Sequence, residues 1–217
     1  EDPYRIWVSE IMLQQTRVEA VKPFYQRFMK TLPDVQSLAQ CQEEELLKLW
    51  EGLGYYNRVR NMQIAAQTVI KDYNGKIPDE YAELQKLKGI GSYTAGAVAS
   101  IAYGKVAPAV DGNVLRVLSR VLLSREDVLK QSVKRSMEER VTAIMPAERP
   151  GAFNQALMEL GAMVCVPNGE PHCTDCPLEK LCQAHLQNVT GEIPVKKAKK
   201  PRRTEEKTVL IIRDGEH

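Results

Sequence analysis

The stretch that most constrains the fold is residues 84–98, which read LQKLKGIGSYTAGAV near the middle of the chain. Gly89 and Gly91 lack a Cβ, so they can take the positive φ angles that a tight turn between two helices needs. The backbone amides after Gly91 open the second helix without helical partners and form a seat for phosphate. Asp111, 18 residues after Tyr93, opens a third helix. The pattern predicts two helices joined by a hairpin, then a helix that begins at a carboxylate.

Helical periodicity extends over almost all of the chain up to residue 186. Apolar residues recur every three to four positions, as they do over residues 18–29 and 114–122. This spacing places them on one face of a helix. No segment before Val209 reads as a strand. The sequence therefore predicts an all-α protein.

Charge is distributed unevenly along the chain, whose formal net charge is +2. Residues 196–207 carry seven basic and two acidic residues, whereas residues 1–195 carry 22 basic and 24 acidic residues, a net −2. Affinity of the folded part for nucleic acid must therefore come from locally placed charges, helix ends and stacking groups. Residues 194–203 are rich in lysine and lack an apolar period. They read as a linker, either a solvated connector or a contact to DNA.

Four cysteines follow one another within 18 residues in the spacing C-x7-C-x2-C-x5-C. Zinc ligands usually come as two separated pairs, whereas a single C-x-x-C with one cysteine on either side suits a [4Fe–4S] cluster. Zinc and free thiols are the alternatives. Cys41 stands alone and reads as a small buried apolar side chain. The predicted cluster ligands are Cys165, Cys173, Cys176 and Cys182.

Two further motifs are long and specific. Residues 2–16 read DPYRIWVSEIMLQQT and residues 52–58 read GLGYYNR. Together with the hairpin they resemble MutY-type adenine DNA glycosylases over residues 2 to about 212. The resemblance implies a monomeric helix-hairpin-helix enzyme that excises adenine opposite 8-oxoguanine, or opposite G, from double-stranded DNA. The first gap in the cysteine run holds seven residues here, against six in these families.

The resemblance also implies a domain organisation. We expect a six-helix module that contains the hairpin, a helical module with the iron–sulfur loop, a linker, and the start of a Nudix-like C-terminal domain that continues beyond this chain. The strand expected at residues 207–213 would belong to that last part. The expected boundaries are 1–105, 106–190, 191–207 and 208–217.

Two carboxylates have the properties that hydrolysis of a purine N-glycosidic bond needs. Glu10 lies among apolar neighbours such as Trp7 and Ile11, where burial would raise its pKa and favour a protonated general acid. Asp111 at a helix start would stay ionised and stabilise a cationic sugar. The plainer alternatives are a solvent-facing charge for Glu10 and a simple N-cap for Asp111.

Further roles are implied by the resemblance alone. Asn113 would support Glu10 and the attacking water. Tyr93 would border the flipped nucleotide, with its hydroxyl free to bond a phosphate or Asp111. Leu53 would be an exposed wedge between two glycines, although core packing is its alternative. The residues expected to contact the lesion or the DNA backbone are Gln15, Thr16, Leu53, Tyr55, Gly89 and Gly91.

Two competing functions remain. An endonuclease III-like glycosylase/lyase would need a lysine where this chain has Tyr93, and usually lacks a carboxylate at the position of Glu10. A non-catalytic DNA-binding module would need neither Glu10 nor Asp111. The adenine-specific hydrolase therefore agrees best with the residues present.

The expected location is intracellular, in a bacterial cytoplasm. The longest uncharged run, residues 89–104, spans 16 positions and falls short of a membrane-spanning helix. The chain opens without the pattern of a secretion signal, and metal-type cysteine spacing suits a reducing compartment. We expect no membrane contact.

Overall fold

The computed structural model describes residues 1–197 and 205–210. Every regular element in this part of the chain is helical, which confirms the predicted all-α class. None of the described helices is both long and apolar enough to cross a membrane. The elements are α1 (Pro3–Leu13), α2 (Val18–Thr31), α3 (Val35–Gln40), α4 (Glu43–Trp50), α5 (Asn57–Asp72), α6 (Tyr81–Leu84), α7 (Ser92–Ala97), the π-helical η1 (Val98–Ala102), α8 (Gly112–Val121), α9 (Gln131–Ile144), α10 (Pro150–Glu159), the π-helical η2 (Leu160–Val164), the 3-10 turns η3 (Cys173–Asp175) and η4 (Glu179–Leu181), and α11 (Gln183–Leu186).

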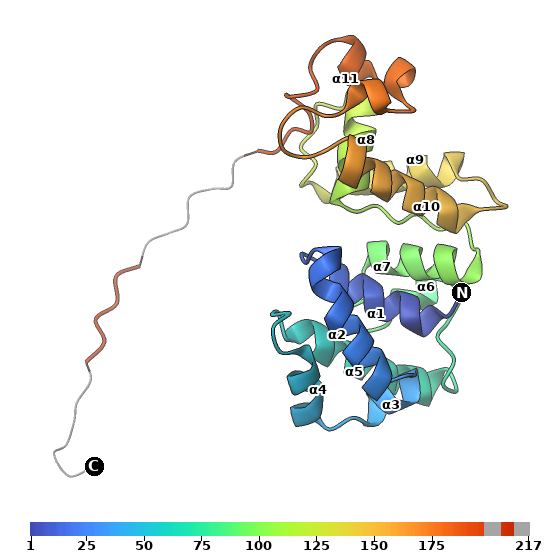
Figure 1. Cartoon of the computed structure of the whole chain (residues 1–217), viewed down its shortest axis with the longest axis vertical. Coiled ribbons are helices and arrows are strands. Elements are labelled where there is room, and N and C mark those ends of the chain that lie inside the picture. The colour runs from blue at the N-terminus through green and yellow to red at the C-terminus, as the bar shows by residue number, and fades with distance from the viewer. Residues whose placement is uncertain (198–204, 211–217) are drawn as a thin grey trace.

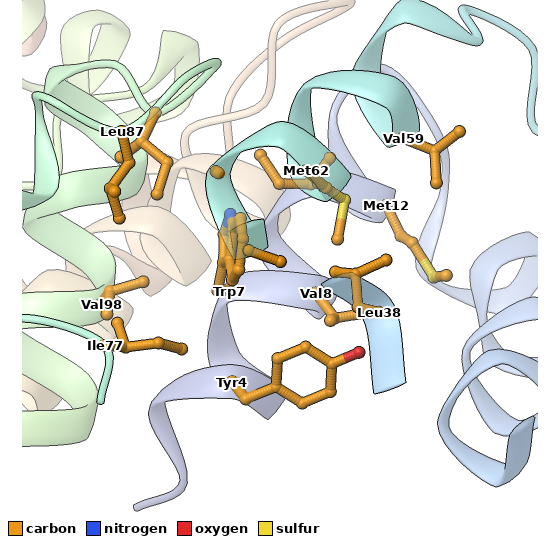
Figure 2. Packing of buried hydrophobic residues seen from close by; sticks show 14 of the residues in the cluster. Tyr4, Trp7, Val8, Met12, Leu38, Val59, Met62, Ile77, Leu87 and Val98 are labelled. Carbon is orange, nitrogen blue, oxygen red and sulfur yellow. The ribbon is translucent and has the colours of Figure 1, made fainter. Parts of the chain in front are cut away.

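The helices lie in two groups, with α1–α7 in one and α8–α11 in the other (Figure 1). The first group encloses a large apolar core that α1 enters with one face. Because helical side chains three and four positions apart share a face, α1 can bury its apolar residues and still present Glu10 elsewhere. Figure 2 shows this packing, with Trp7, Val8 and Met12 from α1, Leu38 from α3, and Val59 and Met62 from α5.

The predicted hairpin joins α6 to α7. Gly89 has a φ of +80° as expected, and a Cβ there would lie 2.8 Å from Asn61 Cβ. Gly91 differs from the expectation, because its φ of −89° and ψ of −179° are those of an extended N-cap residue. An N-cap residue takes extended geometry before its helix begins, so this turn places only Gly89 in the left-handed region.

The chain passes between the two groups through residues 103–111, and this crossover packs backbone against backbone. A Cβ on Gly96 of α7 would lie 1.9 Å from Pro108 O. Just before the crossover, η1 makes a similar contact, since a Cβ on Gly151 of α10 would lie 2.8 Å from Ser100 O. The absence of side chains at these two positions allows the close approach.

Asn154 of α10 fastens the crossover in place. Its side chain is fully buried, its Nδ2 donates to Ala107 O at 2.9 Å, and its Oδ1 accepts from Ala109 N at 3.2 Å. Buried backbone groups need such partners, because leaving them unpaired is costly. The segment that leads to Asp111 is thus held by α10.

The expected linker begins as packed chain. Ile193 is only 2% exposed, its carbonyl oxygen accepts from Arg120 Nε at 2.9 Å, and Val195 O accepts from Val128 N at 3.1 Å. Ile193 stands just before the lysine-rich residues 194–203, and its apolar side chain packs in a small buried cluster with Cys182 and Ala184. Packing therefore continues past the predicted boundary at residue 191.

The strand expected at residues 207–213 is absent where the structure describes it. Residues 205–210 form no regular element, and Val209 and Leu210 are exposed. A strand needs a partner for its backbone groups, and none pairs with residues 205–210 in the described part of the chain. Residues 211–217 lie outside the described residues.

Candidate active site

An open cleft of 430 Å³ lies where α1, α7 and the start of α8 meet. Its volume falls in the range of small-molecule sites. Glu10 projects from the last turns of α1, Tyr93 from the first turn of α7, and Asp111 from the N-cap of α8. The fold thus brings together residues that lie far apart in the sequence. The other residues that line the cleft are Leu13, Gln14, Gln15, Val110, Gly112, Leu115 and Lys134.

Glu10 and Tyr93 form a hydrogen-bonded pair in this cleft. The Tyr93 hydroxyl donates to Glu10 Oε2 at 2.5 Å and lies 3.3 Å from Met158 Sδ. From the sequence, this hydroxyl was expected to bond a phosphate or Asp111. It bonds Glu10 instead, because α7 packs directly against α1.

Burial raises the pKa of Glu10 above its ordinary value, the hydrogen bond from Tyr93 lowers it, and the nearby charge of Asp111 raises it again. Burial is the largest of these causes and favours the protonated carboxyl. The pKa of Tyr93 is also raised, first by burial and then by the charge of Glu10, so this hydroxyl keeps its proton. The pair therefore offers a carboxylic acid with a fixed orientation.

The carboxylate of Asp111 is held at both oxygens. Oδ1 accepts from Val114 N at 2.8 Å, as an N-cap does, and Oδ2 accepts from Asn113 Nδ2 at 2.8 Å. Asn113 Oδ1 in turn accepts from Arg116 Nη2 at 2.8 Å. Asp111 is therefore both a helix cap and a positioned charge on the cleft.

Asn113 supports Asp111 rather than Glu10, contrary to the expectation. The structure shows no hydrogen bond between Asn113 and Glu10 among the described residues. The reason is local: Asn113 lies two residues after Asp111 and one helical turn before Arg116, so both partners are within its reach.

The two turns expected to contact the lesion both carry left-handed residues. Gln15 has a φ of 63° and Tyr55 a φ of 48°. A non-glycine residue in this region costs about 1–2 kcal/mol. Both side chains are exposed, Tyr55 to 68%, and Thr16 beside Gln15 is half-buried. Such strain at exposed residues is common at binding sites.

Leu53 is not the exposed wedge that the sequence predicted. It is only 7% exposed and belongs to the core of the first group, so the core-packing alternative is correct. The glycines on either side bend the chain so that Leu53 turns inward while Tyr55 turns outward. Gly89 and Gly91 are exposed at the hairpin, where no side chain caps the start of α7.

Three residues at or near the site are not among those predicted from the sequence. Lys134 of α9 lines the cleft, and Met158 of α10 contacts the Tyr93 hydroxyl. Arg58 donates hydrogen bonds to the backbone of both turns that carry left-handed residues. Periodicity gave no signal for Lys134 or Met158, because their roles depend on how distant helices pack. Arg58 stands inside the GLGYYNR motif, and that position was the available signal.

The four clustered cysteines line one pocket between α8, η2 and the last helical turns. Burial raises the pKa of Cys173 and of Cys176, and the neighbouring cysteines add to the effect at both. Arg120 Nη1 donates to Cys165 Sγ at 3.1 Å. In residues 1–197 and 205–210, no three His, Cys, Asp or Glu side chains lie close enough to hold a single metal ion. A set of four thiols facing one pocket suits a larger group.

Cys41 is half-buried and stands apart from this pocket. Its Sγ lies 3.4 Å from Gln42 O, a contact within its own chain segment. The expectation of a small buried side chain at Cys41 is therefore only partly met.

Comparison with known proteins identifies the relatives of this chain. Residues 8–143 match the HhH-GPD superfamily of base excision DNA repair proteins. Adenine DNA glycosylase of Rattus norvegicus is 46% identical over 88% of the chain, and that of Buchnera aphidicola subsp. Baizongia pistaciae is 38% identical over 92%. A solved non-covalent endonuclease III–DNA complex superimposes with a TM-score of 0.74 at 28% identity, covering 87% of this chain and 86% of that protein.

The chain spans 37% of the rat protein's length and 56% of the Buchnera protein's length. These relatives come from a mammal and a bacterium, so the bacterial cytoplasm stays a prediction. The resemblance drawn from the motifs is confirmed, as is the helix-hairpin-helix glycosylase fold. The chain belongs to the HhH-GPD superfamily of base excision DNA repair proteins.

Proposed function

We propose that this chain carries the catalytic part of a monofunctional adenine DNA glycosylase, which hydrolyses the bond between adenine and its sugar. The observation that carries the proposal is the shared cleft of Glu10 and Asp111, in which burial raises the pKa of Glu10 and hydrogen bonds hold both carboxylate oxygens of Asp111. One carboxyl that holds a proton and one positioned to carry charge are what the reaction needs. The identity to adenine DNA glycosylases supports the choice of base.

The proposed reaction begins with an adenine extruded from the helix into the cleft. Protonated Glu10 donates its proton to the base as the bond to C1′ breaks, and the bonding electrons leave with the base. Asp111 stabilises the positive charge that develops on the sugar. Water then attacks C1′ and gives its proton to the Glu10 carboxylate, which restores the acid.

We propose that the DNA partner is double-stranded, with adenine opposite 8-oxoguanine or G. The exposed hairpin at Gly89 and Gly91 would bind phosphate through backbone amides. Tyr55 would stack against bases, and a stacking aromatic contributes about 1–3 kcal/mol. Gln15 and Thr16 would contact the strand opposite the excised base. One copy of the chain contains all of these groups, so a monomer would suffice.

The two helix groups are proposed to be two modules on either side of the active cleft. In the second, Cys165, Cys173, Cys176 and Cys182 would hold a [4Fe–4S] cluster through their thiolates. When bound, the cluster would supply structural cross-linking between η2 and the last turns. Purified protein should then absorb broadly at about 400 nm, whereas about one zinc per chain without iron would contradict this part.

A gel assay under single turnover tests the proposed activity. Duplexes carry A opposite 8-oxoguanine, G or T, and a separate duplex carries thymine glycol. The expected result is cleavage of the adenine strand only after alkali, fastest opposite 8-oxoguanine. Direct strand nicking or activity on thymine glycol would favour the lyase alternative, and binding without base release would favour a non-catalytic module.

A further inference from the structure

Arg58 near the start of α5 joins two segments that are distant in the sequence. Its Nη1 donates to Ile11 O at 2.8 Å and to Gln14 O at 2.9 Å, at the end of α1. Its Nη2 donates to Leu53 O at 3.1 Å and to Gly54 O at 3.3 Å. The fork of a guanidinium can serve four carbonyls in this way, whereas an ammonium is a single compact charge.

The carbonyls of Gln14 and Gly54 each precede one of the left-handed residues. Gln15 follows the first and Tyr55 the second, and both side chains are exposed. The Arg58 guanidinium also lies 5.7 Å from the centre of the Tyr55 ring, within cation–π range. The same side chain therefore fixes the backbone before both strained residues and contacts one of them.

Trp50 contacts both Arg58 and the turn that carries Tyr55. Its ring centre lies 5.4 Å from the Arg58 guanidinium, and its Nε1 donates to Gly54 O at 3.0 Å. The turn that carries Tyr55 is thus fixed from two sides. The turn that carries Gln15 receives its hydrogen bonds from a distant segment through Arg58, which donates to Ile11 O and Gln14 O.

We propose that Arg58 is a positioning residue that holds Gln15 and Tyr55 as one pre-formed surface for the DNA strand opposite the excised base. This proposal rests on the proposed function. Without the guanidinium fork, each strained residue can relax to an ordinary φ, and its side chain then leaves the surface. DNA binding would then have to order the Gln15 and Tyr55 turns again, and this free-energy cost weakens the affinity for DNA. Chemistry at Glu10 would change little once DNA is bound.

The test compares Arg58→Lys with Arg60→Lys, a matched control on the same helix. Arg60 is exposed and makes a 2.8 Å ion pair with Glu43. The probe is a duplex with 2′-fluoro-adenosine opposite 8-oxoguanine, whose electron-poor sugar resists hydrolysis. Arg58→Lys should raise the Kd about tenfold or more, a change of about 1.4 kcal/mol. On the same duplex with ordinary deoxyadenosine opposite 8-oxoguanine, the variant should release adenine at a single-turnover rate within about threefold of the wild-type rate at saturating enzyme. Arg60→Lys should change neither value.

A double-mutant cycle separates positioning from a general loss of structure. In a Gln15→Ala/Tyr55→Ala background, Arg58→Lys should change the Kd less than about twofold. An undiminished effect in that background would overturn the proposal. Urea unfolding gives the folded fraction, and Arg58→Gln replaces Arg58→Lys if the latter does not fold. If the wild type binds but releases no adenine, the proposed function fails while the binding cycle still decides the role of Arg58.

Discussion

The hydroxyl of Tyr93 on α7 donates a 2.5 Å hydrogen bond to Glu10 Oε2 on α1, across 83 positions of sequence. This bond favours the ionised carboxylate, whereas burial favours the protonated form. The two influences oppose each other at one group, and burial is the larger. The acidity of Glu10 therefore depends on how the hairpin helix packs against α1.

Tyr93→Phe should move the pH dependence of adenine release. The wild-type rate should fall as the pH rises through the raised pKa of Glu10, because the proton donor is lost. The variant loses the hydrogen bond that lowers this pKa, so its alkaline limb should shift to higher pH. Single-turnover rates across the pH range check this. If the alkaline limb of the pH–rate profile stayed at the same pH in Tyr93→Phe, then Glu10 would not be the group that sets this limb.

Glu10→Gln should lower the rate of adenine release by about 10²–10⁴-fold, while the affinity for the duplex stays near the wild-type value. The amide keeps the shape of the side chain but cannot supply a proton. Single-turnover kinetics and a binding titration measure the two effects. A variant that retained near wild-type rates would show that the acid is another group.

The same substitution should also change how stability depends on pH. A carboxyl with a raised pKa in the folded state stabilises the protein below its unfolded pKa, near 4.5, and this contribution is lost as the pH rises through the folded pKa. Glu10→Gln stays neutral throughout. Its free energy of unfolding should exceed that of the wild type at pH 8, and the difference should shrink at pH 4. Urea titrations at pH 8 and pH 4 measure the free energies of unfolding. A difference between variant and wild type that is the same at both pH values would contradict a pKa of Glu10 raised by burial.

Asp111→Asn should lower the rate of base release by about 10²–10³-fold, because the charge facing the sugar is lost. The exposed Asp72 at the end of α5 offers a control, and Asp72→Asn should leave the rate unchanged. Since an asparagine can still cap α8, the melting temperature of Asp111→Asn should fall only slightly. If Asp111→Asn and Asp72→Asn released adenine at equal rates, the charge of Asp111 would have no part in the mechanism.

Borohydride trapping should separate the hydrolase from a lyase. A glycosylase/lyase needs an amine that attacks the sugar C1′ and displaces the base, after which the sugar ring opens and an imine forms. Tyr93 has no amine, so the wild type should give little adduct and an intact abasic strand. Lys134 lines the cleft, and Lys134→Gln should remove what adduct remains. Tyr93→Lys should raise trapping. Efficient nicking by the wild type would favour the endonuclease III-like alternative.

The helical class and the hairpin could be predicted because both depend on local pattern. Apolar periodicity specifies a helix face, and Gly89 specifies a left-handed turn. The positions of Glu10 and Asp111 in one cleft agree with the motif resemblance, although neither residue alone indicates the other. The two carboxyl groups of the proposed site were therefore found through long motifs rather than through burial and charge alone.

The remaining features depend on contacts between distant segments. Leu53 turns inward because the core of the first group has room for it, which its flanking glycines did not reveal. Asn113 bonds Arg116 only because α8 has begun at Asp111. Ile193 is buried by its neighbours in space, within the range 191–207 that was expected to be a linker. Such outcomes follow from tertiary packing, which a single sequence does not display.

The backbone contacts of Gly96 and Gly151 have a consequence for how this protein can change over generations. Gly96 faces Pro108 O and Gly151 faces Ser100 O with no room for even a methyl group. In most cores a misfit can be relieved by trimming a neighbouring side chain, but here the neighbour is backbone, which no codon change can shorten. These two positions are therefore closed to substitution unless the helices themselves move apart, and with them the walls of the cleft.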